Sequence, residues 1–352
     1  MRPLLFVTNL VAPERVEPFR RLHEREDVVF ALFGGRSTHA VAESGAPLPF
    51  PHRRVAQRAI AGLAASGEFR AVVCGTAGRV ALPAAYLGAR RAGVPFVLWS
   101  ALWAHPRTPA GIAGWPVLRR VYRTADAVVA YGPHVAAYAR DHGAPNVHIA
   151  PQAVDNEFWS VAVAAEKPAP FLAVFTGQLR REKGWRVLLR AWRASGLQAP
   201  KAALVLVGGG PVRARAAASS AASMVGPKPP GEVRNFYAAA DVLVVPSIAT
   251  ASFREPWGLV VNEAMNQGTP IIATDAVGAV AGGLVRHERN GLVVPAGDAR
   301  ALAGAIRRLH DDAKLRERLG AAAREDVRPY TFDAWVDGFS GALGSIAVSK
   351  EA

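Results

Sequence analysis

Short apolar runs alternate with longer amphipathic stretches along most of the chain. The runs are rich in valine, leucine and phenylalanine, which is typical of buried strands in a parallel sheet. Strands are expected in the first half at 4–7, 28–33, 71–74, 96–99 and 127–130, and in the second half at 171–175, 204–207, 242–245, 271–273 and 292–294. Helices are expected between them, in the first half at 13–25, 52–65, 80–92, 116–125 and 133–141. This alternation predicts an α/β protein with two doubly wound units.

The alternation is interrupted once, between Pro151 and Pro170. That stretch is bounded by prolines and has no sustained period, which indicates an interdomain linker. A chain of 352 residues also fits about two domains. We therefore expect a first domain, a linker, a second domain and a C-terminal segment, at 1–155, 156–170, 171–329 and 330–352.

The C-terminal segment carries an apolar stripe at helical spacing, formed by Phe332, Trp335 and Phe339. A stripe of this kind needs an apolar partner surface. We therefore expect a helix that packs back onto the first domain.

Cysteine content and hydropathy indicate a reducing compartment. The single cysteine, Cys74, lies in an apolar run, so no disulfide can form within one chain. The N-terminal apolar run is too short for a signal peptide, and no stretch reaches the roughly 18 apolar residues of a membrane span. The expected location is the cytoplasm, with or without contact to the inner face of the membrane.

The net charge of +14, from 42 basic and 28 acidic residues, predicts an anionic partner. A basic nucleic-acid-binding α/β protein is one such class, but the sequence contains no recognisable RNA- or DNA-binding module, and we expect no nucleic acid. The stretch 116–123 carries Arg119, Arg120 and Arg123 on one face of a helix. Two interpretations stay open for it: a solvated face, or docking to anionic lipid.

Ligands of open parallel sheets bind beyond the carboxyl ends of the strands, so the turns that follow strands are where a site is expected. The turn 176–185 combines Gly177 with the cations Arg180, Arg181 and Lys183, which suits a diphosphate, and a basic solvated turn is the alternative. The glycines at 208–210 lack the dinucleotide-binding spacing, and a tight turn explains them equally well.

A third turn, 253–270, contains two glutamates, Glu255 and Glu263. A helix is expected from Gly258 to about Gln267, and the N–H groups of Gly258, Leu259 and Val260 would then form an anion site. Carboxylates beside such a site are suited to accept hydrogen bonds from sugar or ribose hydroxyls. The alternative is a pair of surface glutamates at a helix start.

Four motifs of the second half resemble those of the retaining glycosyltransferases of family 4, which have the GT-B fold of two Rossmann-like domains facing a cleft. The most specific is Glu-x7-Glu, from Glu255 to Glu263, followed by AMNQGTP and IIAT. The others are GQLRREKG at 177–184, YAAADVLVVPS at 237–247 and NGLVVPAGD at 290–298. The family also closes its fold with a C-terminal helix that crosses back to the first domain.

The resemblance implies a role for each matching residue. Glu263 would hold the donor ribose, and Lys183 with the Gly258 and Leu259 amides would take the diphosphate. Glu255 would contact donor-sugar hydroxyls near the reacting carbon. The nucleobase would lie against backbone near Val225 and Gly226.

Two departures from the family pattern affect the expected site. The arginine of the phosphate turn is Gln178 here, and either Arg180 or Arg181 would replace its charge. In the first half the Gly-Gly loop is absent and the usual histidine falls near Ala101. His105 is a candidate catalytic substitute, and a structural histidine is the alternative.

By resemblance, the chain is expected to transfer a sugar with retention from a UDP- or GDP-linked donor to a hydroxyl of a glycan, a lipid-linked intermediate or a small natural product. No Asp-x-Asp ends a strand and no His or Cys ligands cluster, so we expect no metal site and no cofactor besides the co-substrate. A nucleotide-sugar epimerase or a phosphorylase on the same fold stays open.

Overall fold

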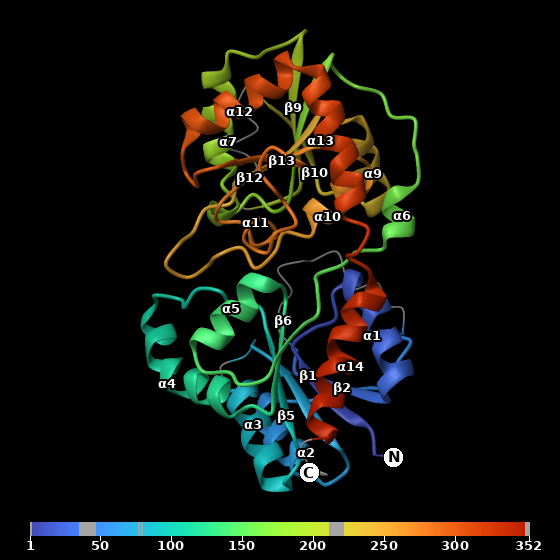
Figure 1. Cartoon of the computed structure of the whole chain (residues 1–352), viewed down its shortest axis with the longest axis vertical. Coiled ribbons are helices and arrows are strands. Elements are labelled where there is room, and N and C mark those ends of the chain that lie inside the picture. The colour runs from blue at the N-terminus through green and yellow to red at the C-terminus, as the bar shows by residue number, and fades with distance from the viewer. Residues whose placement is uncertain (1, 35–46, 77, 79, 211–221, 349–352) are drawn as a thin grey trace. The chain divides into compact units, whose positions relative to one another are not determined.

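The structure, a computed structural model, describes residues 2–34, 47–76, 78, 80–210 and 222–348. It divides into two compact units, which we call unit 1 (Met1–Gln152 with Thr331–Ala352) and unit 2 (Ala153–Tyr330) (Figure 1). The segment 153–170 therefore belongs with unit 2, whereas the sequence pattern placed a linker at 156–170. Helix α6 (Asn156–Ser160) lies in this segment and buries Trp159 in the core of unit 2.

Unit 1 is built on a parallel sheet of order β3-β2-β1-β4-β5-β6-β7. The strands are β1 (Leu4–Thr8), β2 (Val28–Leu32), β3 (His52–Arg54), β4 (Ala71–Gly75), β5 (Phe96–Ser100), β6 (Ala127–Ala130) and β7 (Val147–Ile149). The helical segments are α1 (Pro13–Glu26), η1 (Gln57–Ala59), α2 (Ile60–Ala64), α3 (Ala81–Ala92), α4 (Pro109–Thr124), α5 (Pro133–Asp141) and the C-terminal α14 (Phe332–Val348). Because the central strands are buried on both faces, alternate residues contribute to two separate cores.

Unit 2 repeats this plan with the order β10-β9-β8-β11-β12-β13, also parallel. Its strands are β8 (Phe171–Thr176), β9 (Ala202–Val207), β10 (Ser223–Gly226), β11 (Val242–Val245), β12 (Ile271–Thr274) and β13 (Gly291–Val294). Besides α6, its helical segments are η2 (Arg181–Lys183), α7 (Trp185–Ser195), α9 (Pro230–Ala239), α10 (Val260–Asn266), α11 (Gly278–Ala281), α12 (Ala299–Asp311) and α13 (Ala313–Asp326). The predicted pair of doubly wound α/β units is confirmed.

Two of the expected helices have different bounds. The expectation of a helix over 52–65 is wrong for its first part, because β3 occupies His52–Arg54 and α2 begins only at Ile60. Helix α4 begins at Pro109, seven residues before the expected start at 116, because the Thr108 side chain caps it by accepting from the Gly111 N–H. Pro116 lies inside this helix rather than at its start.

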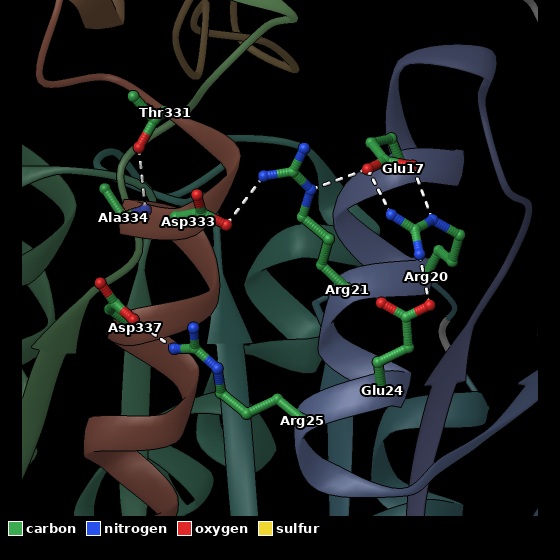
Figure 2. A network of polar contacts seen from close by, with 9 residues as sticks. All are labelled: Glu17, Arg20, Arg21, Glu24, Arg25, Thr331, Asp333, Ala334 and Asp337. Carbon is green, nitrogen blue, oxygen red and sulfur yellow. Dashed lines mark hydrogen bonds and ion pairs between the residues drawn. The ribbon is translucent and has the colours of Figure 1, made fainter.

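The expected return of the C-terminal helix is confirmed, because α14 packs on α1 within unit 1. Trp335 and Phe339 are completely buried, and the Trp335 ring lies 5.8 Å from that of Phe19 on α1. Ion pairs follow the rim of the contact, with Arg21 Nη1 2.8 Å from Asp333 Oδ1 and Arg25 paired with Asp337 (Figure 2).

The contribution of Glu17 on α1 to stability depends on pH, because Glu17 bonds to the arginine that pairs with Asp333. Hydrogen bonds from Arg20 and then Arg21 lower the pKa of Glu17 from 4.5 to about 2. A lowered pKa in the folded state means that the contribution of Glu17 to stability is present above about pH 4.5 and is lost as the pH falls toward 2. The buried aromatic contact under the rim does not depend on pH in this range.

The strand order of unit 2 reverses between β8 and β11, which are neighbours in the sheet. Connections leave these two strands in opposite directions, so the loops that follow them diverge around a shared edge. Doubly wound folds bind their ligands at this point. The loops after β8 and β11 are therefore where the chemistry of unit 2 is expected.

Candidate functional site

The loops that follow β8 and β11 are in direct contact. The Ile248 N–H donates to the Glu182 carbonyl at 2.8 Å. At Gly184 an added Cβ would lie 1.7 Å from the Pro246 carbonyl oxygen, and the backbone has a φ of +68°. Only glycine fits such an approach, so Gly184 allows the backbone of the loop after β8 to contact the backbone of the loop after β11.

An ion pair joins the same two loops. Lys183 Nζ lies 2.5 Å from Glu255 Oε2, and Ser247 Oγ donates to the same oxygen at 3.2 Å. The Glu255 side chain is buried, whereas the Lys183 side chain is 29% exposed. Lys183 also faces the Phe253 ring, 5.8 Å from its centroid. A lysine, a glutamate and a hydroxyl thus converge at the point where the strand order reverses.

The loop after β11 is tied down on either side of Glu255. Residue 255 pairs with Val277 in an isolated parallel bridge. The buried indole N–H of Trp257 donates to Asn262 Oδ1 at 2.8 Å, which fixes the loop to α10. The Glu255 carboxylate is therefore held by backbone and side-chain contacts.

Glu263 occupies the first turn of α10. Tyr237 on α9 donates its hydroxyl to Glu263 Oε2 at 2.8 Å. Tyr237 is completely buried, and this burial, followed by the nearby Glu263 charge, raises the pKa of its hydroxyl well above 10. The phenol therefore stays neutral and acts as a donor to a half-buried carboxylate.

Helix α10 begins at Val260, two residues later than expected, with Leu259 as its N-cap. Gly258 precedes it with a φ of +95°. The amides of all three residues still lie at the helix start, where N–H groups have no intrahelical acceptor. The three residues predicted to form the anion site therefore lie at the start of a short helix, Val260–Asn266.

The strand ends on the other side of β8 are closely packed. The Gly177 N–H donates to the Val207 carbonyl at 2.9 Å, and the Gly208 N–H donates to the Gly226 carbonyl at 2.8 Å. An added Cβ at Gly208 would lie 1.9 Å from the Gly177 carbonyl oxygen. Val225 and Gly226 therefore end an edge strand beside these turns, and their binding of a nucleobase stays a prediction.

The structure distinguishes the two arginines that follow Gln178. Arg180 Nε pairs with Glu182 Oε1 at 2.7 Å. The Arg181 side chain is exposed and, within the described part of the chain, forms no ion pair. Gln178 is half-buried on the same turn. Of the two cations, Arg181 is the one whose charge is not matched by a carboxylate.

His105 lies in unit 1, and the structure gives it a local contact. Its Nε2 donates to the Gly111 carbonyl in the first turn of α4 at 3.0 Å, and its ring lies 4.4 Å from that of Trp115. This contact ties the loop before α4 to the helix. A catalytic role for His105 stays a prediction.

Two residues were missed as contributors to the site, Ser247 and Tyr237. Both belong to the YAAADVLVVPS motif, and each donates a hydroxyl to one of the two glutamates. Their positions at the two ends of that motif were the sequence feature that could have identified them.

Within the described ranges, no group of three His, Cys, Asp or Glu side chains could hold a metal ion. No helix of the described residues is long and apolar enough to cross a membrane.

Comparison with known families gives a match over the second half of the chain. Residues 160–326 match the family described as Glycosyl transferases group 1. The match includes the turn with Lys183 and both glutamates, Glu255 and Glu263. It lies wholly within unit 2.

Curated relatives match over about half of this chain. A D-inositol 3-phosphate glycosyltransferase of Corynebacterium diphtheriae is 32% identical over 187 residues, which cover 49% of this chain and 42% of the relative. The protein of the same name from Corynebacterium glutamicum is 34% identical over 179 residues, covering 46% and 40%. The chain thus spans about two-fifths of the length of these relatives.

Solved structures match over nearly the whole chain. Anabaena Alr3699/HepE in complex with UDP and glucose has a TM-score of 0.76 at 18% identity, covering 98% of this chain and all of that protein. Sucrose-phosphate synthase from Thermosynechococcus elongatus has a TM-score of 0.74 at 20% identity, covering 99% and 100%. These matches confirm the predicted GT-B class of two Rossmann-like domains.

Proposed function

We propose that this chain is a glycosyltransferase that moves a sugar from a nucleotide diphosphate sugar to an acceptor hydroxyl, with its donor site in unit 2. The observation that carries the proposal is the Lys183–Glu255 ion pair at the strand reversal, inside the segment that matches group 1 glycosyl transferases. The likeness to HepE, which is described in complexes with UDP and UDP-glucose, supports a nucleotide-sugar donor.

The donor diphosphate binds where positive charge and backbone N–H groups meet. Lys183 and Arg181 supply the charge, and the amides of Gly258, Leu259 and Val260 supply donors at the start of α10. Glu263 accepts hydrogen bonds from the ribose, and the base lies against the backbone at Val225 and Gly226. Residues of this chain hold the diphosphate, so the transfer is proposed to proceed without a metal ion.

The ion pair gives Lys183 two successive partners. Without a donor, Glu255 neutralises the lysine. With a donor bound, the diphosphate competes for the ammonium group, and Glu255 Oε2 becomes available to donor-sugar hydroxyls. Ser247 keeps the carboxylate in place during this exchange because its hydroxyl contacts the same oxygen.

Transfer with retention follows from attack on the side of the leaving group. The bond between the anomeric carbon and the phosphate oxygen breaks, the acceptor oxygen bonds to the carbon on the same face, and its proton passes to the departing phosphate. Glu255 stabilises the positive charge that develops on the sugar. His105 in unit 1 is kept as a candidate catalytic residue. The acceptor is a glycan, a lipid-linked sugar or a small natural product.

An epimerase or a phosphorylase would use a similar donor site. A transferase releases free nucleoside diphosphate only when an acceptor hydroxyl is supplied, whereas an epimerase needs no acceptor and a phosphorylase needs inorganic phosphate. Product analysis with and without each co-substrate separates the three.

Glu263→Ala is expected to weaken binding of both the nucleotide sugar and the free nucleoside diphosphate by about 10- to 150-fold. The variant loses charge-assisted hydrogen bonds worth roughly 1.5 to 3 kcal/mol. Isothermal titration calorimetry with UDP and GDP measures the change. Glu232→Ala is the matched control, because Glu232 is an exposed glutamate of the neighbouring α9 and pairs with Lys228 just before that helix. Unchanged affinity in Glu263→Ala would remove Glu263 from the site.

Peripheral contact with an anionic membrane surface is the second part of the proposal, and α4 supports it. Ile112 and Val117 are 64% and 47% exposed, and Arg119, Arg120 and Arg123 are exposed on the same helix. The helix contains no acidic residue. Exposed apolar side chains beside unopposed arginines suit the boundary between lipid headgroups and acyl chains.

Replacing the three arginines of α4 by glutamine is expected to lower binding to anionic vesicles at low salt by up to about a hundredfold. Each arginine near such a surface contributes roughly 1 kcal/mol. Co-sedimentation with phosphatidylglycerol vesicles measures it, and Arg190→Gln/Arg307→Gln in unit 2 is the control. Failure of the parent protein to bind these vesicles contradicts the membrane contact.

A further inference from the structure

The hydrogen bond between Tyr237 and Glu263 joins two elements that are separated in sequence. Tyr237 lies on α9 and is completely buried, and its hydroxyl donates to Glu263 Oε2 on α10 at 2.8 Å. We propose that Tyr237 is a positioning residue that fixes the Glu263 carboxylate for recognition of the nucleotide's ribose hydroxyls. This inference rests on the proposed function, because it assigns Glu263 to the ribose.

The tyrosine is itself held by contacts that do not involve its hydroxyl. Its ring lies 5.8 Å from the Trp159 ring, and its carbonyl accepts from Thr269 Oγ1 at 2.8 Å. The side chain also belongs to the buried core of unit 2. Because these contacts fix the ring, the position of the phenol O–H does not depend on Glu263. The hydrogen bond therefore restricts the orientation of the Glu263 carboxylate.

The chemistry of the pair suits a ribose. The Glu263 carboxylate accepts from the Tyr237 hydroxyl through Oε2. An ionised carboxylate has two oxygens with about four acceptor sites, so it can accept from more than one donor, as the two vicinal hydroxyls of a ribose require. Glutamate loses rotamer freedom when its side chain is fixed, so a carboxylate that is already oriented binds ribose with a smaller entropy loss.

A purely structural role for Tyr237 makes a different prediction. If the residue only fills the core, the ring matters and the hydroxyl does not, and any loss of affinity would affect all nucleotides alike. Tyr237→Phe keeps the ring and removes only the hydroxyl. The dependence of its effect on the ribose hydroxyls therefore distinguishes positioning from packing.

The experiment is calorimetry of the parent and of Tyr237→Phe with a ribonucleoside diphosphate and its 2′-deoxy and 3′-deoxy counterparts. The nucleotide is whichever of UDP, GDP and ADP binds the parent most tightly. We expect Tyr237→Phe to weaken ribonucleotide binding about 3- to 10-fold, the effect of losing one hydrogen bond. Binding of at least one deoxy counterpart should change less than about twofold, so that the preference for ribose narrows.

Two results would overturn the inference. One is an equal loss of affinity for the ribo- and both deoxynucleotides, and the other is no loss for any of them. If the parent binds none of the nucleotides, the proposed function fails, and this inference fails with it. If the parent binds and prefers ribose, and Tyr237→Phe retains that preference in full, only the inference fails.

Two further variants keep the test independent of folding. Tyr122→Phe in unit 1 removes a hydroxyl from another fully buried tyrosine, bonded to Ser100 Oγ at 2.7 Å, and should leave nucleotide affinity unchanged. Glu263→Gln, combined with Tyr237→Phe, completes a double-mutant cycle. We expect the tyrosine substitution to have less effect once the carboxylate is gone, and strictly additive effects would contradict the positioning role.

Discussion

Glu255→Gln is expected to lower kcat by about 10²- to 10³-fold while it changes the affinity for nucleoside diphosphate by less than about threefold. Glutamine keeps the shape of the side chain and much of its hydrogen bonding. It removes the negative charge that opposes the developing positive charge on the sugar, and only an interaction of the transition state affects kcat in this way. Initial-rate kinetics beside calorimetry measure the two quantities.

The direction of the small affinity change is also informative. In the parent, Lys183 is paired with Glu255, and the diphosphate is proposed to compete for the same ammonium group. The variant lacks that competitor, so affinity for the diphosphate should stay equal or rise slightly. Glu182→Gln is the matched control, because it neutralises a carboxylate of the adjoining loop that pairs with Arg180 instead. A Glu255→Gln variant with the kcat of the parent contradicts the role assigned to Glu255.

Trp335→Ala is expected to lower the free energy of unfolding of unit 1 by about 3 to 5 kcal/mol, the usual cost of removing a buried aromatic side chain. Trp335 is completely buried and contacts Phe19, Trp99 and Phe339, so the cavity would lie between α14 and the sheet. Urea denaturation followed by circular dichroism measures the change.

Removing all residues after Arg328 should reduce stability and activity together.

The charged rim of the same helix provides the comparison. Asp333 is 63% exposed and pairs with Arg21 (Figure 2). Exposed ion pairs contribute little, so Asp333→Ala should lower the free energy of unfolding by less than about 1 kcal/mol. Similar losses for Asp333→Ala and Trp335→Ala would show that the helix is not held by its aromatic face.

The strands were predictable where both of their faces are buried. In β1, β5 and β11 every residue is buried, so the sequence shows uninterrupted apolar runs. β3 was missed because all three of its side chains are exposed at the edge of the sheet, and its basic residues carry no apolar period. The start of α4 was misplaced because Gly111 and Gly114 weaken its helical pattern, although Thr108 and Pro109 form a recognisable N-terminus.

The residues of the candidate site could be named from the sequence, but most of their contacts could not. The motifs singled out Lys183, Glu255 and Glu263 because their residue types and spacing suit a diphosphate and hydroxyls. The ion pair between Lys183 and Glu255 depends on the adjacency of β8 and β11, which a linear pattern does not specify. Likewise, the contact of Tyr237 with Glu263 depends on the packing of α9 beside α10, so this contact could be found only from the fold.

The central claim is that unit 2 binds a nucleotide diphosphate sugar, and a thermal-shift panel of UDP-, GDP-, ADP- and TDP-sugars tests it most directly. A ligand that binds only the folded state stabilises it by about 2.7 kcal/mol when its concentration is a hundred times Kd. The melting temperature therefore rises with ligand concentration. We expect one base to give a saturable rise in the parent, and Glu263→Ala to need a higher concentration for the same rise. No shift with any of the four at millimolar concentration would contradict the claim.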